Sequence, residues 1–143
     1  MESPINVLKE ILNRLEIEPN SITIEGDVIL LDATDPSLLI GSRGQNILCL
    51  ECLVKRIVFK QEGVTPEFRL DVNNYRQRQK EFLERIARDG AYRATVLKKS
   101  IELRPMSSFD RRIVHEELSE RRDVNTESKG KGFSRFVVIS PSY

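Results

Sequence analysis

The apolar positions of residues 1–73 switch between a helical and a strand-like period. Where apolar residues recur every three or four positions we expect an amphipathic helix, and where they alternate with polar residues we expect a strand. Gly26-Asp27 separates two strand-like runs and suits a tight hairpin turn. The expected elements are a helix over 5–15, strands over 21–25 and 28–32, a short helix over 35–40, a longer helix over 45–62 and a strand over 68–72. This half of the chain therefore predicts the order α-β-β-α-α-β.

The second half of the chain predicts helices followed by short strands. A helical pattern runs from Asn74 to about Lys99, and Gly90 offers a break that would divide it into two helices. Ser107 and Asp110 have the spacing of a helix-capping box. The other expected elements are a short strand over 100–104, a helix that opens at 107 and strands over 124–127 and 135–139. The prediction is an α+β chain of two small modules, residues 1–73 and 74–143.

Charge distinguishes the two modules. Residues 1–73 carry 7 Lys and Arg against 12 Asp and Glu, a net charge of −5, whereas residues 74–143 carry 16 against 10, a net charge of +6. The formal charge of +1 for the whole chain hides this asymmetry. A basic module is attracted to polyanions such as nucleic acids. The alternative is that abundant surface charge falls unevenly by chance in two short segments.

Composition narrows the class of protein further. With 39% apolar and 31% charged residues, the chain has the composition of a soluble globular protein. No apolar run approaches the roughly 18 residues of a membrane-spanning helix, and the start, Met1–Pro4, lacks the basic segment of a signal peptide. Cys49 and Cys52 lie three apart in a helical pattern, unlike the cysteines of a secreted disulfide framework. We therefore expect a cytoplasmic protein with no direct membrane insertion.

The first candidate site is the loop Gly41-Ser42-Arg43-Gly44, between a short and a long helix. Glycines at both corners allow a sharp turn and a close approach of the backbone to a ligand. The following helix points its free N–H groups and the positive end of its dipole toward the loop, which favours phosphate. Arg43 adds a cation. Gln-Asn follows the second glycine where a Walker A loop needs Lys and Ser or Thr, so that type of phosphate loop is excluded.

This loop, within the α-β-β-α-α-β order, makes residues 1–73 resemble a KH domain in the bacterial type II arrangement. The resemblance implies that the loop clamps about four nucleotides of a single-stranded backbone while an apolar groove takes the bases. Ile40 and Ile47 would border that groove. The alternative is a KH fold whose loop is only a turn between helices. Since the loop holds one basic residue in an acidic module, we expect this half alone to bind weakly.

The second candidate site is the pair Arg111 and His115, four residues apart on one face of a predicted helix. Arg offers a planar fork for phosphate, and His can donate a hydrogen bond or stack on a base. Protonation of His115 would add a charge facing a polyanion, so binding is expected to strengthen from about pH 8 to pH 6. Such spacing is common, however, and a pair satisfied within the protein surface is the alternative.

Leu103-Arg104-Pro105-Met106 precedes this pair, and residues 124–130 and 135–139 follow it. With these segments the second module resembles an R-3-H domain, a small binder of single-stranded nucleic acid. A KH domain followed directly by an R-3-H domain resembles the bacterial Jag family, also described as KhpB or SpoIIIJ-associated RNA-binding proteins. The resemblance implies that Ser128 and Arg135 make further polar contacts to nucleic acid. Family members commonly carry a further N-terminal Jag domain and a charged linker, and this chain shows neither. Phe133 stands at a turn where the family more often has proline.

Enzymatic and metal chemistry find little support. His115 is the only histidine, so one chain cannot build a histidine-based metal cluster. Cys49-Leu50-Glu51-Cys52 has the C-x-x-C spacing, but no second pair completes a zinc site, and its place inside a helix rather than at the helix start does not suit thioredoxin-like chemistry. We therefore expect no enzyme and no cofactor.

The resemblance thus implies a bacterial protein that binds single-stranded RNA or single-stranded DNA and acts in post-transcriptional regulation. The resemblance adds a small KH-only protein as a partner. The alternative is an interaction adaptor or chaperone-like factor linked to the cell envelope or to membrane-protein biogenesis.

Overall fold

The computed structural model, which describes residues 1–142, divides the chain after Arg76. The two parts, Met1–Arg76 and Gln77–Tyr143, are hereafter unit 1 and unit 2, and each has its own three-stranded sheet and its own apolar core. The predicted α+β fold of two small modules is confirmed.

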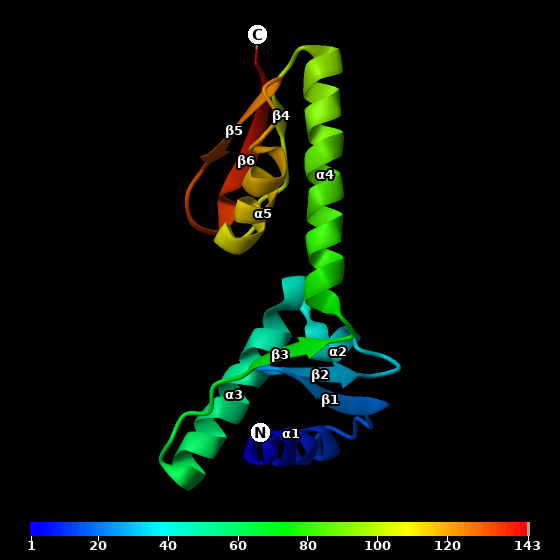
Figure 1. The fold of residues 1–143 in the computed structure, drawn as a ribbon, viewed down its shortest axis with the longest axis vertical. Coiled ribbons are helices and arrows are strands. Elements are labelled where there is room, and N and C mark those ends of the chain that lie inside the picture. The colour runs from blue at the N-terminus through cyan, green and yellow to red at the C-terminus, as the bar shows by residue number, and fades with distance from the viewer. Residues whose placement is uncertain (143) are drawn as a thin grey trace. The chain divides into compact units, whose positions relative to one another are not determined.

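Unit 1 has the predicted order of helices and strands, with one additional 3-10 turn at the glycine loop. Its sheet has the order β1-β2-β3, in which β2 runs antiparallel to β1 and parallel to β3 (Figure 1). Its elements are α1 (Glu2–Arg14), β1 (Ser21–Glu25), β2 (Val28–Asp32), α2 (Ser37–Ile40), η1 (Ser42–Gly44), α3 (Gln45–Glu62) and β3 (Arg69–Val72).

Burial alternates along β2, as expected for a sheet with helices on one face. Ile29 and Leu31 are buried, whereas their neighbours are more exposed. The buried residues join one core with Leu8 and Leu12 of α1 and Val54 of α3. The helical and strand periods of the sequence thus converge on a single apolar cluster.

Unit 2 packs two helices against an antiparallel sheet with the order β4-β6-β5 (Figure 1). The Ser107 hydroxyl accepts a hydrogen bond of 3.2 Å from the Asp110 N–H, so this predicted cap is confirmed. The elements of this part are α4 (Tyr75–Leu97), which starts in unit 1, β4 (Ile101–Glu102), α5 (Ser108–Leu118), β5 (Val124–Lys129), η2 (Gly132–Ser134) and β6 (Phe136–Pro141).

The predicted break at Gly90 is wrong, because α4 is one continuous helix. A Cβ atom at Gly90 would lie 2.6 Å from Cδ1 of Ile139. Ala87, Ala91 and Ala94 are likewise fully buried. This glycine is therefore part of a small-residue face that lets α4 approach β6, and close packing offsets its low helix propensity.

The structure contains no membrane-spanning helix among residues 1–142: no helix there combines the length and the apolar character that a bilayer requires.

Candidate nucleic-acid interface

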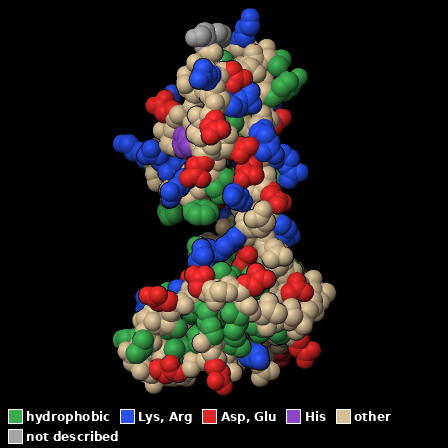
Figure 2. All heavy atoms as spheres, viewed as in Figure 1, with side chains coloured by type: hydrophobic (Ala, Val, Ile, Leu, Met, Phe, Trp, Pro, Cys, Tyr) green, Lys and Arg blue, Asp and Glu red, His purple; other side chains and the backbone are tan. Residues whose placement is uncertain are grey.

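Basic side chains of unit 2 differ in whether a carboxylate neutralises them. On the face drawn in Figure 2, Lys and Arg side chains gather beside the single histidine, interspersed with Asp and Glu. Ion pairs occupy Lys80, Arg88, Arg93, Arg112 and Arg121. Near the β5–β6 connection, Arg104, Lys129, Lys131 and Arg135 are exposed and form no ion pair within the described chain. Free positive charge therefore remains at this end of the sheet.

His115 joins α5 to β5. Its Nδ1 atom lies 2.7 Å from the Thr126 hydroxyl oxygen and its Nε2 atom 2.9 Å from the Ser128 hydroxyl oxygen. Thr126 and Ser128 are two positions apart on β5, so both point to the same face of the sheet. A hydroxyl can donate or accept, and the pair can therefore satisfy either neutral tautomer of the ring as well as the imidazolium.

The electrostatics of this cluster favour a neutral imidazole. Burial lowers the pKa of His115 below its ordinary value of 6.5, and the positive charge of Arg111 lowers it further. At neutral pH the ring is therefore an uncharged connector between the helix and the strand. Charge at this site comes from the arginine.

The Arg111 guanidinium is held from the side of the preceding loop. Its Nη1 donates a hydrogen bond of 2.9 Å to the Met106 carbonyl, and its Nε is buried without a hydrogen-bond partner in the described part of the chain. The Met106 N–H in turn donates 3.0 Å to the Arg135 carbonyl. The structure therefore brings together Arg111, His115 and Ser128, and joins the backbone of Arg135 to the same cluster.

Two contributors to the cluster are absent from the sequence-based prediction. Thr126 could have been found, because strand alternation places its side chain on the same face as Ser128. The Met106 carbonyl had no such signal, since a backbone acceptor is defined by the path of a loop and not by residue type.

Known proteins resemble this chain both in its second half and over most of its length. A family model for the R-3-H domain matches residues 81–141. The chain is 38% identical over 128 residues to the RNA-binding protein KhpB of Clostridium symbiosum. The matched residues make up 90% of this chain and 54% of the relative. The chain is homologous to the KhpB proteins. Against KhpB of Bacillus subtilis (strain 168) it is 39% identical over 106 residues, covering 73% of this chain and 51% of the relative.

The expected resemblance to the Jag/KhpB family is thereby confirmed. The chain spans about half the length of the first two KhpB relatives, and 34% of the length of KhpB from Lactiplantibacillus plantarum, to which it is 34% identical. The R-3-H match contains α5 and β5, hence the Arg111–His115 segment and the hydroxyls that it contacts. The relatives are named as RNA-binding proteins, which agrees with the expectation of a binding protein.

Gly41 is required by the shape of the loop in unit 1. Its backbone has φ 67° and ψ −170°, a combination that residues with a Cβ atom avoid. A Cβ there would also lie 2.5 Å from Cγ of Asn46. The Asn46 Nδ2 donates a hydrogen bond of 2.7 Å to the Leu38 carbonyl, so the amide that occupies this space also connects α2 to α3.

Gly44 is enclosed by the side chain of Tyr75. It is buried, has φ 73°, and a Cβ there would lie 2.5 Å from Cε1 of Tyr75. Between the glycines, Ser42 and Arg43 are exposed, and Arg43 has the left-handed φ of 57°. The loop therefore presents two polar side chains to solvent on a tightly packed base.

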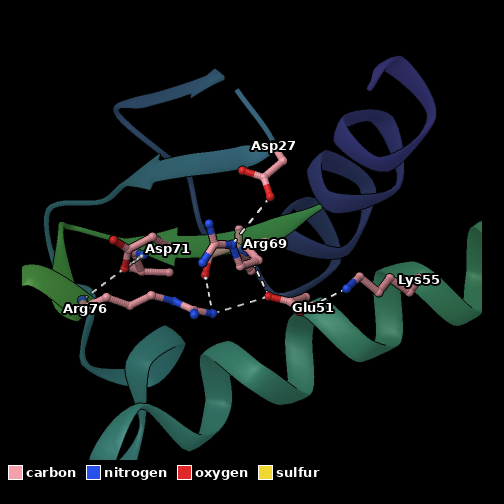
Figure 3. Close-up of polar contacts among 8 residues, drawn as sticks. Asp27, Glu51, Lys55, Arg69, Asp71 and Arg76 are labelled. Atoms are coloured by element: carbon pink, nitrogen blue, oxygen red, sulfur yellow. Dashed lines mark hydrogen bonds and ion pairs between the residues drawn. The ribbon is translucent and has the colours of Figure 1, made fainter. Parts of the chain in front are cut away.

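Glu51 is the centre of an ion-pair cluster that joins α3, β3 and the start of α4 (Figure 3). Glu51 Oε2 accepts a hydrogen bond of 2.9 Å from the Leu70 N–H and lies 3.5 Å from Arg76 Nη2, while Oε1 lies 3.0 Å from Lys55 Nζ. The Arg76 N–H approaches Asp71 Oδ1 at 3.3 Å. Since Arg76 follows Tyr75, these contacts hold the start of α4 against α3 and β3, next to Gly44.

The two isoleucines expected to border a groove differ in their positions. Ile40 is half-buried at the end of α2. Ile47 is only 2% exposed and belongs to the core of unit 1. The expectation for Ile47 is therefore corrected: its helical position turns the side chain toward the sheet, where it supports the loop from inside and offers no surface to a base.

Proposed function

We propose that this protein binds single-stranded RNA through unit 2, with Arg111, Ser128 and Arg135 as contacts to the phosphate backbone and His115 as the residue that positions Ser128. The observation that carries this proposal is the hydrogen-bonded cluster of His115 with the two β5 hydroxyls, next to cations that no carboxylate neutralises within the described chain. The R-3-H match and the names of the relatives support it.

The chemistry of the cluster suits a phosphate backbone. A guanidinium can make two parallel hydrogen bonds to phosphate oxygens, and a serine hydroxyl commonly adds a third contact of the same kind. The Ser128 hydroxyl can donate to a phosphate when His115 Nε2 is protonated and donates to it. Free Lys and Arg side chains supply affinity by releasing counterions from the nucleic acid.

The loop Gly41-Ser42-Arg43-Gly44 is the second proposed contact. Its two exposed side chains and its uncapped position before α3 suit the backbone of a single strand. Because these contacts are to phosphate, single-stranded DNA is an expected second ligand. Ile40, half-buried beside the loop, is the proposed apolar neighbour of a base.

The test is a fluorescence anisotropy titration of the full chain with labelled single-stranded RNA, the same sequence as DNA, and the RNA duplex. We expect the single strands to bind, and binding to weaken as salt rises. No binding to either single strand at low salt, or equal binding to the duplex, would contradict the proposal. A protein that binds RNA in this way would act in the cytoplasm and in post-transcriptional regulation.

A second candidate function is protein interaction, for which α3 provides the observation. Leu48, Leu53 and Phe59 are exposed on this helix, and Figure 2 shows hydrophobic side chains gathered on the drawn face of unit 1. We propose a small KH-only protein as the partner. Size-exclusion chromatography with light scattering should detect a complex with such a protein, and Leu48→Asp should dissociate it while leaving RNA binding of unit 2 intact.

A further inference from the structure

The connection between β5 and β6 is a short ordered turn with an aromatic side chain at its centre. The 3-10 turn Gly132–Ser134 is closed by backbone hydrogen bonds from Ser134 to the Lys131 carbonyl (3.2 Å) and from Arg135 to the Gly132 carbonyl (3.3 Å). Phe133 is the central residue of this turn. The backbone thus fixes the point on the surface from which the Phe133 side chain projects.

No other part of the described chain covers the Phe133 side chain. Its relative exposure is 102%, higher than that of every other large apolar residue described as exposed. A single exposed apolar residue is normal on a protein surface, so exposure alone identifies no site. What distinguishes this ring is the charge around it.

Two cations flank the ring. Lys131 and Arg135 lie two residues before and two residues after Phe133, both are exposed, and neither forms an ion pair within the described chain. The nearest carboxylate on β5 belongs to Glu127, which strand alternation places on the face opposite Ser128. The ring therefore lies between two unpaired cations along the chain, next to the proposed phosphate contacts.

We propose that Phe133 forms a stacking subsite for an unpaired nucleobase, with Lys131 and Arg135 holding the phosphates on either side of it. Aromatic rings among backbone-tracking cations are the combination by which proteins bind single strands without reading their sequence. Stacking needs a free base face, which a duplex covers, so the subsite takes single-stranded RNA or DNA. It rests on the proposed function and adds to it the discrimination against duplexes.

A tryptophan at this position would report stacking directly. The chain contains no Trp, so Phe133→Trp introduces a single tryptophan, which can be excited selectively over the three tyrosines. We expect its emission to be quenched by a single-stranded oligonucleotide and not by the matching duplex. Tyr92→Trp is the matched control, because Tyr92 is 65% exposed on α4 of the same unit but lies outside the proposed contacts; its emission should stay constant.

The affinity of side-chain variants separates stacking from other roles of the ring. Phe133→Ala should weaken single-strand binding about 5- to 150-fold, the range found for one stacked base, with an unchanged circular dichroism spectrum. Phe133→Tyr should retain the affinity and Phe133→Leu should lose most of it, because Leu has no π face. Full affinity of the Leu variant would overturn stacking in favour of a simple apolar contact.

The outcomes for the subsite and for the proposed function are distinguishable. If the wild-type chain binds single strands but Phe133→Ala binds equally well and Phe133→Trp is not quenched, the subsite is overturned while RNA binding stands. If the wild-type chain binds no single strand, the proposed function fails and the subsite fails with it. Quenching together with the loss of affinity in the Ala variant would establish the subsite.

Discussion

The Nε2 atom of His115 lies 2.9 Å from the hydroxyl oxygen of Ser128. The sequence predicts that both residues contact nucleic acid, yet they contact one another, and the second ring nitrogen is engaged by Thr126 at 2.7 Å. A ring with both nitrogens occupied is a positioning residue in the free protein. Its first effect is on the stability of unit 2.

His115→Ala should therefore destabilise the fold. The change removes two hydrogen bonds between α5 and β5 and leaves two half-buried hydroxyls without this partner, so we expect a loss of about 1–3 kcal/mol. Thermal unfolding followed by circular dichroism measures it. Arg112→Ala on the same helix is the control: its ion pair with Glu116 is exposed, and such pairs contribute at most about 1 kcal/mol. Equal melting temperatures for His115→Ala and the wild type would contradict the positioning role.

The lowered pKa of His115 makes the stability of the folded protein depend on pH. The unfolded chain binds a proton at this ring near pH 6.5, whereas the folded chain binds it only at lower pH, because burial and the charge of Arg111 oppose protonation. The neutral ring thus contributes stability that is fully present above pH 6.5 and is lost as the pH falls through the lowered pKa. Melting curves of the wild type and of His115→Gln should converge over that acidic window. Parallel curves throughout it would contradict the assignment.

The same lowered pKa corrects an expectation from the sequence. The Arg111–His115 spacing alone predicts that protonation of His115 strengthens RNA binding from about pH 8 to pH 6. Since the ring remains neutral to lower pH in the folded protein, most of any such response should fall below pH 6.5.

The sequence could predict the order of helices and strands and the positions of the two candidate sites, the glycine loop and the Arg111–His115 pair, because both depend on local patterns. It could not predict that α4 continues through Gly90, since the reason is the distant contact with Ile139. For Ile47 the sequence does hold the signal: it shares the apolar face of α3 with Leu50 and Val54, and only the family resemblance suggests a groove instead. Hydrogen bonds from a loop carbonyl such as that of Met106 follow from tertiary structure alone.

Two glycines with similar backbone angles allow the cost of a left-handed backbone to be separated from the cost of a steric clash. Gly44 has φ 73° and a Cβ there would meet Tyr75 at 2.5 Å, whereas Gly63 has φ 78° with nothing within 4 Å. Gly63→Ala should cost only the left-handed backbone, about 1–2 kcal/mol. Gly44→Ala should cost clearly more, because an overpacked site adds about 1–3 kcal/mol. Urea unfolding measures both variants, and equal losses would show that Tyr75 moves away freely.

The exposed loop residues should affect binding without affecting the fold. Ser42→Asp with Arg43→Asp places two carboxylates where phosphates are proposed, so affinity for single-stranded RNA should fall roughly tenfold or more at low salt. Lys60→Asp with Gln61→Asp makes the same change in charge at exposed positions near the end of α3 and is the matched control. A filter-binding assay compares the two. If both double variants lose affinity equally, the effect is one of net charge and the loop is not a contact.

Arg111 and His115 should act on RNA affinity as one unit. The guanidinium is close enough to the ring to lower its pKa, and the ring in turn orients Ser128. Arg111→Ala and His115→Ala should each weaken binding, and the double variant should lose less than the sum, with a coupling on the order of 0.5–3 kcal/mol. Arg93→Ala combined with His115→Ala is the control pair. Arg93 already pairs with Asp89 on α4, so its effect should be additive.

The affinities of these single and double variants have to be measured on folded protein, since His115→Ala also lowers stability. Anisotropy titrations with single-stranded RNA at a temperature well below every melting transition meet that condition. If the folded His115→Ala variant binds as tightly as the wild type, the imidazole only holds α5 against β5. Arg111 would then be an isolated phosphate contact, with its geometry fixed by the Met106 carbonyl alone.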